Sequence, residues 1–289
     1  MLFQNKCLLL PLCLCCLVIG FASCKDNQVS SPQFYQFNKA QTRELGKALN
    51  EISGIAYAGN GRLLAVADSK ERVFEIDLNS KKLKDYTDKV VGPDSDLEDI
   101  VMVDSTIYLL MSKGIIKEIP QRVRDTAGVK TYELELEGTN DFETLYYDPT
   151  AEGLVLLCKT CAHEKGEGIR TAFRFDLASK TFDSSAFFTI SKEDIRNLLK
   201  NNDAKFDPSA AAIHPINKRL YILSSAGTLL VITDTRGKAI EAYRLNPDDF
   251  PQAEGIAFAP NGEMYISNEG KYGRPTLSIF PYQQQGKKK

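Results

Sequence analysis

Short alternating runs of apolar and polar residues recur along this chain, with turn residues between them. The first set has four such runs, at residues 55–57, 63–67, 72–78 and 82–86. The dipeptides Asn60-Gly61 and Asn79-Ser80 stand between runs, and Asn-Gly favours the tight turn of a β-hairpin. This set therefore predicts four short antiparallel strands that follow one another in the chain.

One five-residue phrase opens each of five such sets. A Ser or Glu, here called the anchor, is followed by a short residue and an apolar run. The phrases are Ser53-Gly54-Ile55-Ala56-Tyr57, Glu98-Asp99-Ile100-Val101-Met102, Glu143-Thr144-Leu145-Tyr146-Tyr147, Ser209-Ala210-Ala211-Ala212-Ile213 and Glu254-Gly255-Ile256-Ala257-Phe258. The anchors are 45, 45, 66 and 45 residues apart, and a period of about 40–45 residues is typical of propeller blades. We predict an all-β fold, a single five-bladed β-propeller with four-stranded blades.

Two of the five sets are irregular. The third is longer, and Ser191 with Asp194 forms a capping-box pattern that predicts a short helix over residues 191–201. The fifth has only three strands before the tail, so we expect residues 34–49 to supply its outer strand, because an unpaired edge is a liability. Six blades remain an alternative, but residues 160–205, where a sixth repeat would have to lie, contain no copy of the phrase.

The N-terminal 23 residues have the pattern of a targeting segment. Lys6 precedes an apolar run over residues 7–21, which is too short for a membrane span and ends in small residues. Residues 21–24, Phe-Ala-Ser-Cys, resemble a bacterial lipobox, in which Cys24 becomes the lipidated first residue. An ordinary secretory signal is the alternative. We expect a protein of the bacterial cell envelope, anchored through Cys24 to a membrane, the outer one in preference, and facing the periplasm or the surface.

The same pattern divides the chain into four parts. Residues 1–23 are the lipoprotein signal peptide, 24–33 the lipidated cysteine and a flexible tether, 34–282 the propeller and 283–289 a disordered tail. The net charge of −2 becomes about −3 once Lys6 leaves. A chain with this balance lacks the basic surface of a nucleic-acid-binding protein, so we expect none as a partner, and we expect a monomer.

The cysteines and histidines of this chain offer few candidates for a metal or redox site. Five of the seven cysteines lie at or before position 24, so Cys158 and Cys161 alone belong to the propeller. A zinc site would need a fourth ligand beyond these two cysteines and His163. The c-type haem signature needs His directly after the second Cys, where Ala162 stands, and a thioredoxin-like site needs a βαβ setting, which is absent from the predicted fold. A local disulfide and two free thiols both remain open. His214 precedes Pro215 at a turn position, so we interpret it as a turn residue.

The anchors are the candidate functional site. Each opens an innermost strand, and innermost strands line the central channel of a propeller, so the anchors should form a ring near one mouth. Glu98, Glu143 and Glu254 would repel one another there, and desolvation adds to the cost. A hard divalent cation with oxygen ligands would offset both effects, and calcium tolerates an irregular ring. We predict calcium on these glutamates, with hydroxyl or water-bridged contacts from Ser53 and Ser209.

A second row of polar residues follows each anchor by 15 or 16 positions, at the far end of the next strand. Its members are Asp68, Lys113, Lys159, Ser225 and Glu269. We expect these residues at the same channel mouth as a ligand-binding rim. The two lysines could neutralise the glutamates without a metal or hold an anionic ligand above it. A purely structural polar ring, bonded between blades, is the alternative to the metal site.

Five segments in order resemble the SdiA-regulated family of bacterial proteins. They are Ile52-Ser53-Gly54-Ile55-Ala56-Tyr57, Asp96-Leu97-Glu98-Asp99-Ile100, Phe142-Glu143-Thr144-Leu145, Asp207-Pro208-Ser209 and Ala253-Glu254-Gly255-Ile256-Ala257-Phe258. The resemblance covers residues 40–282 and implies a five-bladed propeller, distantly similar to NHL-repeat and phytase-like propellers, and a bound calcium ion. It also implies export or membrane association. Asp99 and Thr144 stand where the family commonly has Gly, and Ala210 departs from the phrase as well.

These observations favour a binding module over an enzyme. The first hypothesis is a membrane-anchored exported lipoprotein that binds calcium in its channel and recognises an unknown small-molecule or protein ligand over that mouth. The second is a metal-dependent hydrolase of phosphate esters or lactones, as in phytase-like propellers. The absence of histidine among the ring candidates makes the hydrolase hypothesis the less favoured one, and no catalytic residue is predicted. A scaffold that binds calcium only for stability is the third.

Overall fold

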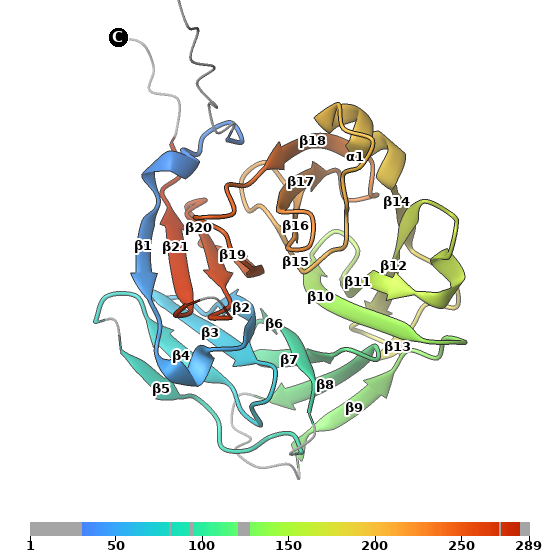
Figure 1. Cartoon of the computed structure of the whole chain (residues 1–289). Helices are drawn as coiled ribbons and strands as arrows, with labels where there is room; N and C mark the ends of the chain where they lie inside the picture. The colour runs from blue at the N-terminus through green and yellow to red at the C-terminus, as the bar shows by residue number, and fades with distance from the viewer. Residues whose placement is uncertain (1–30, 81, 93–94, 121–127, 272, 284–289) are drawn as a thin grey trace, which may run out of the picture.

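The computed structural model describes residues 31–80, 82–92, 95–120, 128–271 and 273–283. The predicted signal peptide, Cys24 and most of the predicted tether and tail lie outside these residues. Five antiparallel sheets stand around a central opening, as Figure 1 shows. The predictions of an all-β fold and of five blades are confirmed.

Each blade is a meander of neighbouring strands that starts at the channel. Blade 1 contains β2 (Ile52–Tyr57), β3 (Arg62–Ala67), β4 (Phe74–Asp77) and β5 (Leu83–Asp85). Blade 2 contains β6 (Leu97–Val103), β7 (Thr106–Met111), β8 (Ile115–Pro120) and β9 (Lys130–Glu133). Blade 3 contains β10 (Asn140–Asp148), β11 (Gly153–Cys161), β12 (Ile169–Asp176) and β13 (Thr181–Phe182), and β14 (Phe188–Ser191) also pairs with β12. Blade 4 contains β15 (Ala210–Ile213), β16 (Leu220–Ser224), β17 (Leu229–Thr233) and β18 (Ala239–Arg244).

Blade 5 is completed by a strand from the other end of the chain. Its own strands are β19 (Ala253–Phe258), β20 (Met264–Asn268) and β21 (Thr276–Phe280). The N-terminal strand β1 (Gln41–Glu44) pairs antiparallel with β21, with Gln41 opposite Ile279 (Figure 1). The prediction that residues 34–49 supply the outer strand is confirmed, and the ring is closed by backbone hydrogen bonds between its two ends.

Blade 3 accommodates the additional residues of its repeat at its outer side. The helix α1 (Lys192–Leu199) follows β14, and the Ser191 side chain accepts a hydrogen bond from the Asp194 N–H, as the capping pattern predicts. Cys158 and Cys161 form a disulfide, which settles the two alternatives left by the sequence. Three short 3-10 helices complete the described structure: Phe37–Lys39, Lys47–Leu49 and Ala162–Glu164.

The hydrophobic core is divided among the five contacts between neighbouring blades. Each contact holds its own cluster; the cluster between blades 2 and 3, for example, includes Leu110, Phe142 and Phe175. The second strand of a blade is covered on both faces by its neighbours, which is why β3 and β16 read as nearly continuous apolar runs. The outer strand β18 is only half-buried. This packing fixes the innermost strands side by side around the channel.

All five innermost strands run in the same direction through the ring. Every anchor therefore lies at one mouth of the channel, and the fifth residue of every phrase lies at the other. The strand β21 ends, and β1 begins, at the same mouth as the fifth residues, because β1, β21, β20 and β19 alternate in direction. Among the described residues no helix has the length and apolarity to cross a membrane.

Candidate functional site

Anchor side chains leave the regular strand ladder at a repeated irregularity. In β2 the pairing with β3 shifts between Ile52 and Gly54, so Ser53 is the extra residue of a β-bulge. The same shift leaves one extra residue each in β6, β10 and β19, namely Glu98, Glu143 and Glu254. A bulge re-aims the side chain of its extra residue. Ser209 directly precedes β15, and its N–H donates to the carbonyl of Leu223 at 2.9 Å.

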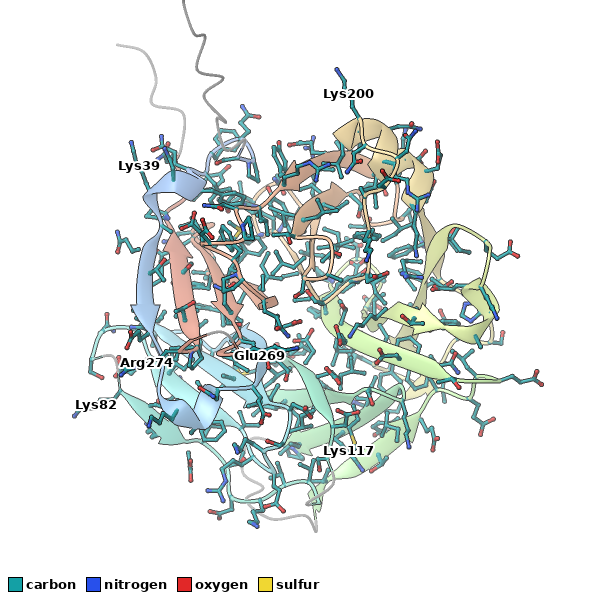
Figure 2. All side chains as sticks on the ribbon, viewed as in Figure 1. Lys39, Lys82, Lys117, Lys200, Glu269 and Arg274 are labelled. Atoms are coloured by element: carbon teal, nitrogen blue, oxygen red, sulfur yellow. A yellow bond between two sulfur atoms is a disulfide. The ribbon has the colours of Figure 1, made fainter. Side chains whose placement is uncertain are left out.

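A cavity of about 210 Å³ opens at the anchor end of the channel; we call this end the acidic mouth. Its lining consists of Glu51, Ile52, Ser53, Asp68, Glu98, Glu143, Gln252, Glu254, Glu269 and Lys271. The structure thus brings together all three predicted metal ligands and three predicted rim residues: Ser53, Asp68 and Glu269. Figure 2 shows Glu269 beside the central opening, whereas Lys82 and Lys200 project from the periphery.

The other predicted residues have different surroundings. Lys159 Nζ forms an ion pair with Glu143 at the same mouth. Ser209 Oγ donates to the carbonyl of Ala253 in blade 5 at 2.8 Å, which is the inter-blade bonding of the structural alternative. Within its own blade it accepts from the N–H of Ser225 at 3.2 Å. Lys113 is exposed and lines a different cavity, beside the segment that follows β9. The structure does not place it with the other rim residues.

Burial and mutual repulsion oppose ionisation of the glutamates at the acidic mouth. Burial, together with the charges of Glu143, Asp96 and other acids, raises the pKa of Glu98 to about 9. Burial, together with the charge of Glu143, raises the pKa of Glu254 to about 8. Without a bound cation, both carboxyl groups therefore keep their protons at neutral pH, and ionising them in this small cavity is unfavourable.

Lys159 compensates one side of this mouth. Burial opposes its charged form, but the hydrogen bond and charge of Glu143, with the charge of Asp141, outweigh burial and raise the pKa of Lys159. Its Nζ lies 3.8 Å from a carboxylate oxygen of Asp141. Burial still raises the pKa of Glu143, against the effect of Lys159. The lysine therefore reduces the repulsion around Glu143 without removing it.

A second row of mostly acidic residues was not predicted from the sequence. One ligand oxygen each from Glu98, Asp141 and Glu143 lie within 4.8 Å of one another, which is the spacing of a possible cation site. Asp141 stands two residues before its anchor, and the same position in the five repeats holds Glu51, Asp96, Asp141, Asp207 and Gln252. This spacing was visible in the sequence. The donors are all oxygens, which fits a hard cation such as calcium.

Asp99, the residue after the anchor Glu98, is buried among neighbouring innermost strands. Its side chain is buried, and its two carboxyl oxygens accept the N–H groups of Ile100 and Leu145, each at 2.8 Å. A Cβ on Gly54 would lie 2.4 Å from Asp99 Oδ1, so only glycine leaves room there for the carboxyl group. The acid thus reaches from blade 2 to both neighbouring blades. Burial raises its pKa well above the usual range, although both N–H groups oppose this.

The opposite end of the channel, here called the apolar mouth, is a cavity of about 250 Å³. Its rim includes the fifth residue of every phrase: Tyr57, Met102, Tyr147, Ile213 and Phe258, all half-buried. Asp99 is the one acidic residue among those that line it. One repeated phrase therefore builds two mouths of opposite chemical character.

His214 lies beside the apolar mouth as part of a turn, in agreement with the sequence interpretation. Its Nδ1 accepts the N–H groups of Ile216 and Asn217, at 3.1 and 3.2 Å. The Tyr35 hydroxyl donates to the carbonyl of Gly262 at 2.6 Å and lies 2.7 Å from His214 Nε2. Because the Tyr35 hydroxyl donates its proton to the Gly262 carbonyl, it accepts a hydrogen bond from His214 Nε2. The neutral His214 ring therefore carries its proton on Nε2. Burial, with the charge of Lys218, lowers the pKa of His214 to about 4.

The inserted loop of blade 3 gives no metal site. Cys158, His163 and Glu164 lie close enough to share an ion, but Cys158 is in the disulfide and has no thiolate to offer. Glu164 instead pairs with Arg170 at 2.7 Å. This buried ion pair fastens the loop to β12.

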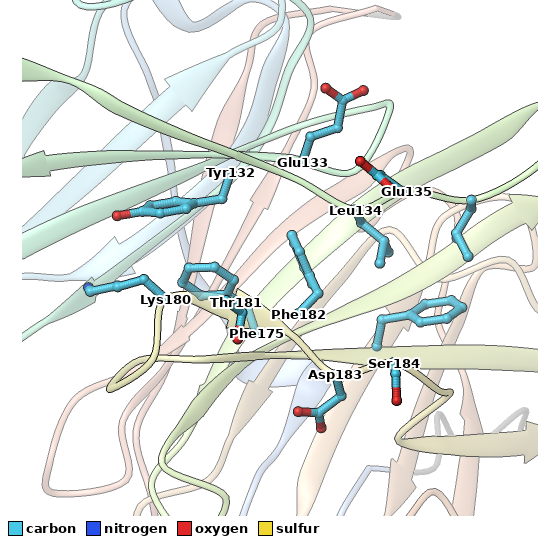
Figure 3. A pocket seen from close by; sticks show the side chains of 12 residues that line it. Tyr132, Glu133, Leu134, Glu135, Phe175, Lys180, Thr181, Phe182, Asp183 and Ser184 are labelled. Atoms are coloured by element: carbon cyan, nitrogen blue, oxygen red, sulfur yellow. The ribbon is translucent and has the colours of Figure 1, made fainter.

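A further cavity of about 410 Å³ lies between the outer strands of blades 2 and 3 (Figure 3). Tyr132, Phe175 and Phe182 line its apolar part. Lys180 lies at its edge, where its Nζ donates to Glu118 at 2.7 Å. This groove lies away from the channel and contains none of the predicted site residues.

The geometry defines a five-bladed β-propeller with one acidic and one apolar channel mouth. The SdiA-regulated family matches residues 28–272, and the chain belongs to that family. The prediction made from the five phrases is therefore confirmed. No curated protein matches the sequence.

Solved structures that resemble this chain are distant in sequence. A luciferin-regenerating enzyme has a TM-score of 0.52 and 11% identity, over 86% of this chain and 98% of that one. Virginiamycin B lyase from Staphylococcus aureus has a TM-score of 0.45 and 13% identity, over 86% of this chain and 75% of that one. A protein of unknown function from Bacteroides thetaiotaomicron has a TM-score of 0.47 and 14% identity, over 78% and 55% of the two chains. At such identities the likeness concerns the fold alone.

Proposed function

We propose that this protein is a calcium-binding propeller whose acidic mouth recognises a ligand or partner protein. The observation that carries the proposal is the convergence of Glu98, Asp141 and Glu143, with Glu254 in the same cavity. A calcium ion would be coordinated by oxygens of these groups, and its charge would favour their ionised forms against the burial and mutual repulsion that raise their pKa values. Lys159 would then hold Glu143 in position beside the ion.

Calcium titration of the metal-free protein tests this proposal. Isothermal titration calorimetry should give one calcium per chain, and Glu98→Gln and Glu254→Gln should each weaken binding at least about tenfold, because each removes a charged oxygen ligand. Glu133→Gln is the matched control, since Glu133 is exposed and lines other cavities. Equal affinity in all three variants, or no calcium binding by the unsubstituted protein, would refute the metal site.

A binding module fits the mouth better than a hydrolase. None of the described residues that line it is a histidine, and His214 lies at the other mouth with both ring nitrogens engaged. The hydrolase alternative predicts turnover of phosphate esters or lactones that depends on calcium and is lost in Glu98→Gln. Absence of turnover, with calcium bound, supports the module.

We also propose that a lipid on Cys24 anchors the propeller and fixes its orientation. Cys24 and Ser31 are seven positions apart, and a chain of that length spans at most about 25 Å. Residues 31–40 lie at the apolar-mouth side, where Tyr35 contacts His214 and Gly262. Ile216 is 43% exposed on this side. The anchor would therefore turn the apolar mouth toward the membrane and the acidic mouth away from it.

A further inference from the structure

A buried acid forms the floor of the apolar mouth, and the calcium proposal does not use it. Asp99 is only 4% exposed, yet it lines the cavity of about 250 Å³. In the described part of the chain, the groups that act on its carboxyl group are the N–H groups of Ile100 and Leu145, and no cation is among them. A buried carboxyl group without a cationic partner is costly and calls for an explanation.

Closing the ring does not require this acid. The equivalent positions of the other four phrases hold Gly54, Thr144, Ala210 and Gly255. None of these side chains can bridge two blades as a carboxylate does, and their innermost strands still pack side by side. The acid at blade 2 is therefore an addition to a frame that is complete without it, and Gly54 provides the space it occupies.

We propose that the apolar mouth binds a small organic cation, an amine with an apolar body, whose ammonium group pairs with Asp99. A carboxylate offers about four acceptor positions, and the two N–H groups use two of them. The remaining positions can accept an ammonium group at the floor of the cavity. The body of the amine then lies against Tyr57, Tyr147 and Phe258 at the rim.

The dimensions of the mouth set the size of this ligand. Rim and floor are three residues apart along each innermost strand, which is about 10 Å. A cavity of about 250 Å³ has the volume of about eight liquid waters, so it suits a molecule of about ten non-hydrogen atoms. An anion would meet the carboxyl group of Asp99 without a compensating cation. A neutral molecule would bring no charge that stabilises the carboxylate form of Asp99 against burial.

Two probes that differ only in charge test the proposal on the mature protein. The amine 2-phenylethylamine and the alcohol 2-phenylethanol have the same apolar body. In isothermal titration calorimetry the amine should bind at least about tenfold more tightly than the alcohol, because a charge-assisted pair replaces a neutral hydrogen bond. Equal affinities, or no binding of the amine up to about 10 mM, would overturn the proposal.

Matched substitutions show whether Asp99 is responsible. Asp99→Asn keeps the shape and removes the charge, so it should abolish the preference for the amine. Asp104→Asn is the control, because Asp104 is an exposed residue of the same blade in the hairpin at the same mouth. If Asp99→Asn fails to fold, Met102→Lys provides a second test: a cation at the rim should weaken amine binding about tenfold and leave alcohol binding unchanged.

Competition with calcium distinguishes the two mouths. Amine binding should persist in saturating calcium, because the two cavities have no lining residue in common. Loss of amine binding on calcium addition would place the amine at the acidic mouth and refute the proposal, while leaving the calcium site intact. An unchanged preference for the amine in Asp99→Asn would refute it as well.

Discussion

The two mouths of the channel are built from the same five strands and have opposite chemistry. At the acidic mouth four of the five anchors are displaced from the ladder by bulges, and the carboxyl groups of the three glutamates share one cavity. At the apolar mouth the same strands remain in register and present aromatic and aliphatic side chains. A local irregularity at one end of four innermost strands therefore distinguishes a polar site from an apolar one at the other end of the same strands.

The largest expected effect is that of calcium removal on thermal stability. At a calcium concentration of about 100 times the dissociation constant, binding stabilises the fold by about 2.7 kcal/mol, or about 5–10 °C in Tm for a domain of this size. Calorimetry with and without a chelator measures this shift. Glu98→Gln should lose it, and it should persist in Glu133→Gln. A Tm that does not respond to the chelator would contradict calcium binding at the acidic mouth.

Next in size is the effect of filling the space opposite Asp99. In Gly54→Ala the new Cβ would lie 2.4 Å from Asp99 Oδ1 and 2.7 Å from Asp99 Cα. Backbone and acid must shift, at a cost of about 1–3 kcal/mol in the free energy of unfolding. Gly92→Ala is the control, because no atom of the described residues lies within 4 Å of its added Cβ. Equal stability of the two variants in urea would show that Asp99 does not fill the space beside Gly54.

The two mouths should also respond to pH with opposite signs. In the metal-free protein Glu98 keeps its proton up to about pH 9, while its unfolded value is 4.5. The folded state then binds more protons than the unfolded state between these values, so stability falls as pH rises through this window. Urea unfolding of metal-free protein at several pH values measures the slope. Glu98→Gln should flatten it, and an unchanged slope in that variant would contradict the assignment.

His214 gives the reverse dependence at the apolar mouth. Its pKa falls from 6.5 to about 4 on folding, so the unfolded state binds more protons in between. Stability is therefore lost as pH falls from 6.5 toward 4. Tyr35→Phe removes the hydroxyl that holds this ring and should cost about 1–2 kcal/mol at neutral pH. If Tyr35→Phe unfolds in urea at the same midpoint as the unsubstituted protein, the contact contributes nothing.

The smallest expected effect is spectroscopic and concerns the orientation of the mouths. The chain has no tryptophan, so a single introduced tryptophan reports one site. In lipidated protein on vesicles with brominated acyl chains, Phe258→Trp should be quenched more strongly than Lys113→Trp. Flotation of the vesicles with the protein tests the anchor independently. Equal quenching of the two variants in protein that floats would refute the orientation and leave the anchor standing.

Much of this fold could be predicted because the repeat is a local, covalent property. The spacing of Ser53, Glu98 and Glu254 gives the blade period, and the missing outer strand of the fifth set points to the N-terminal segment. The helix cap at Ser191 is local as well and is present as expected. The placement of Lys113 could not be read from spacing, because one residue of uncertainty in the returning strand turns the side chain away from the mouth.

The sequence by itself determined the five repeats, their order, the closing strand and the residues that open each phrase. Tertiary structure decided which of those residues share a cavity, that Asp141 joins Glu98 and Glu143, and that Asp99 lies between Gly54 of blade 1 and Leu145 of blade 3. The reason is physical: a repeat fixes positions along one strand. Charge repulsion, burial and the fit of a side chain arise only where five strands from distant parts of the chain converge.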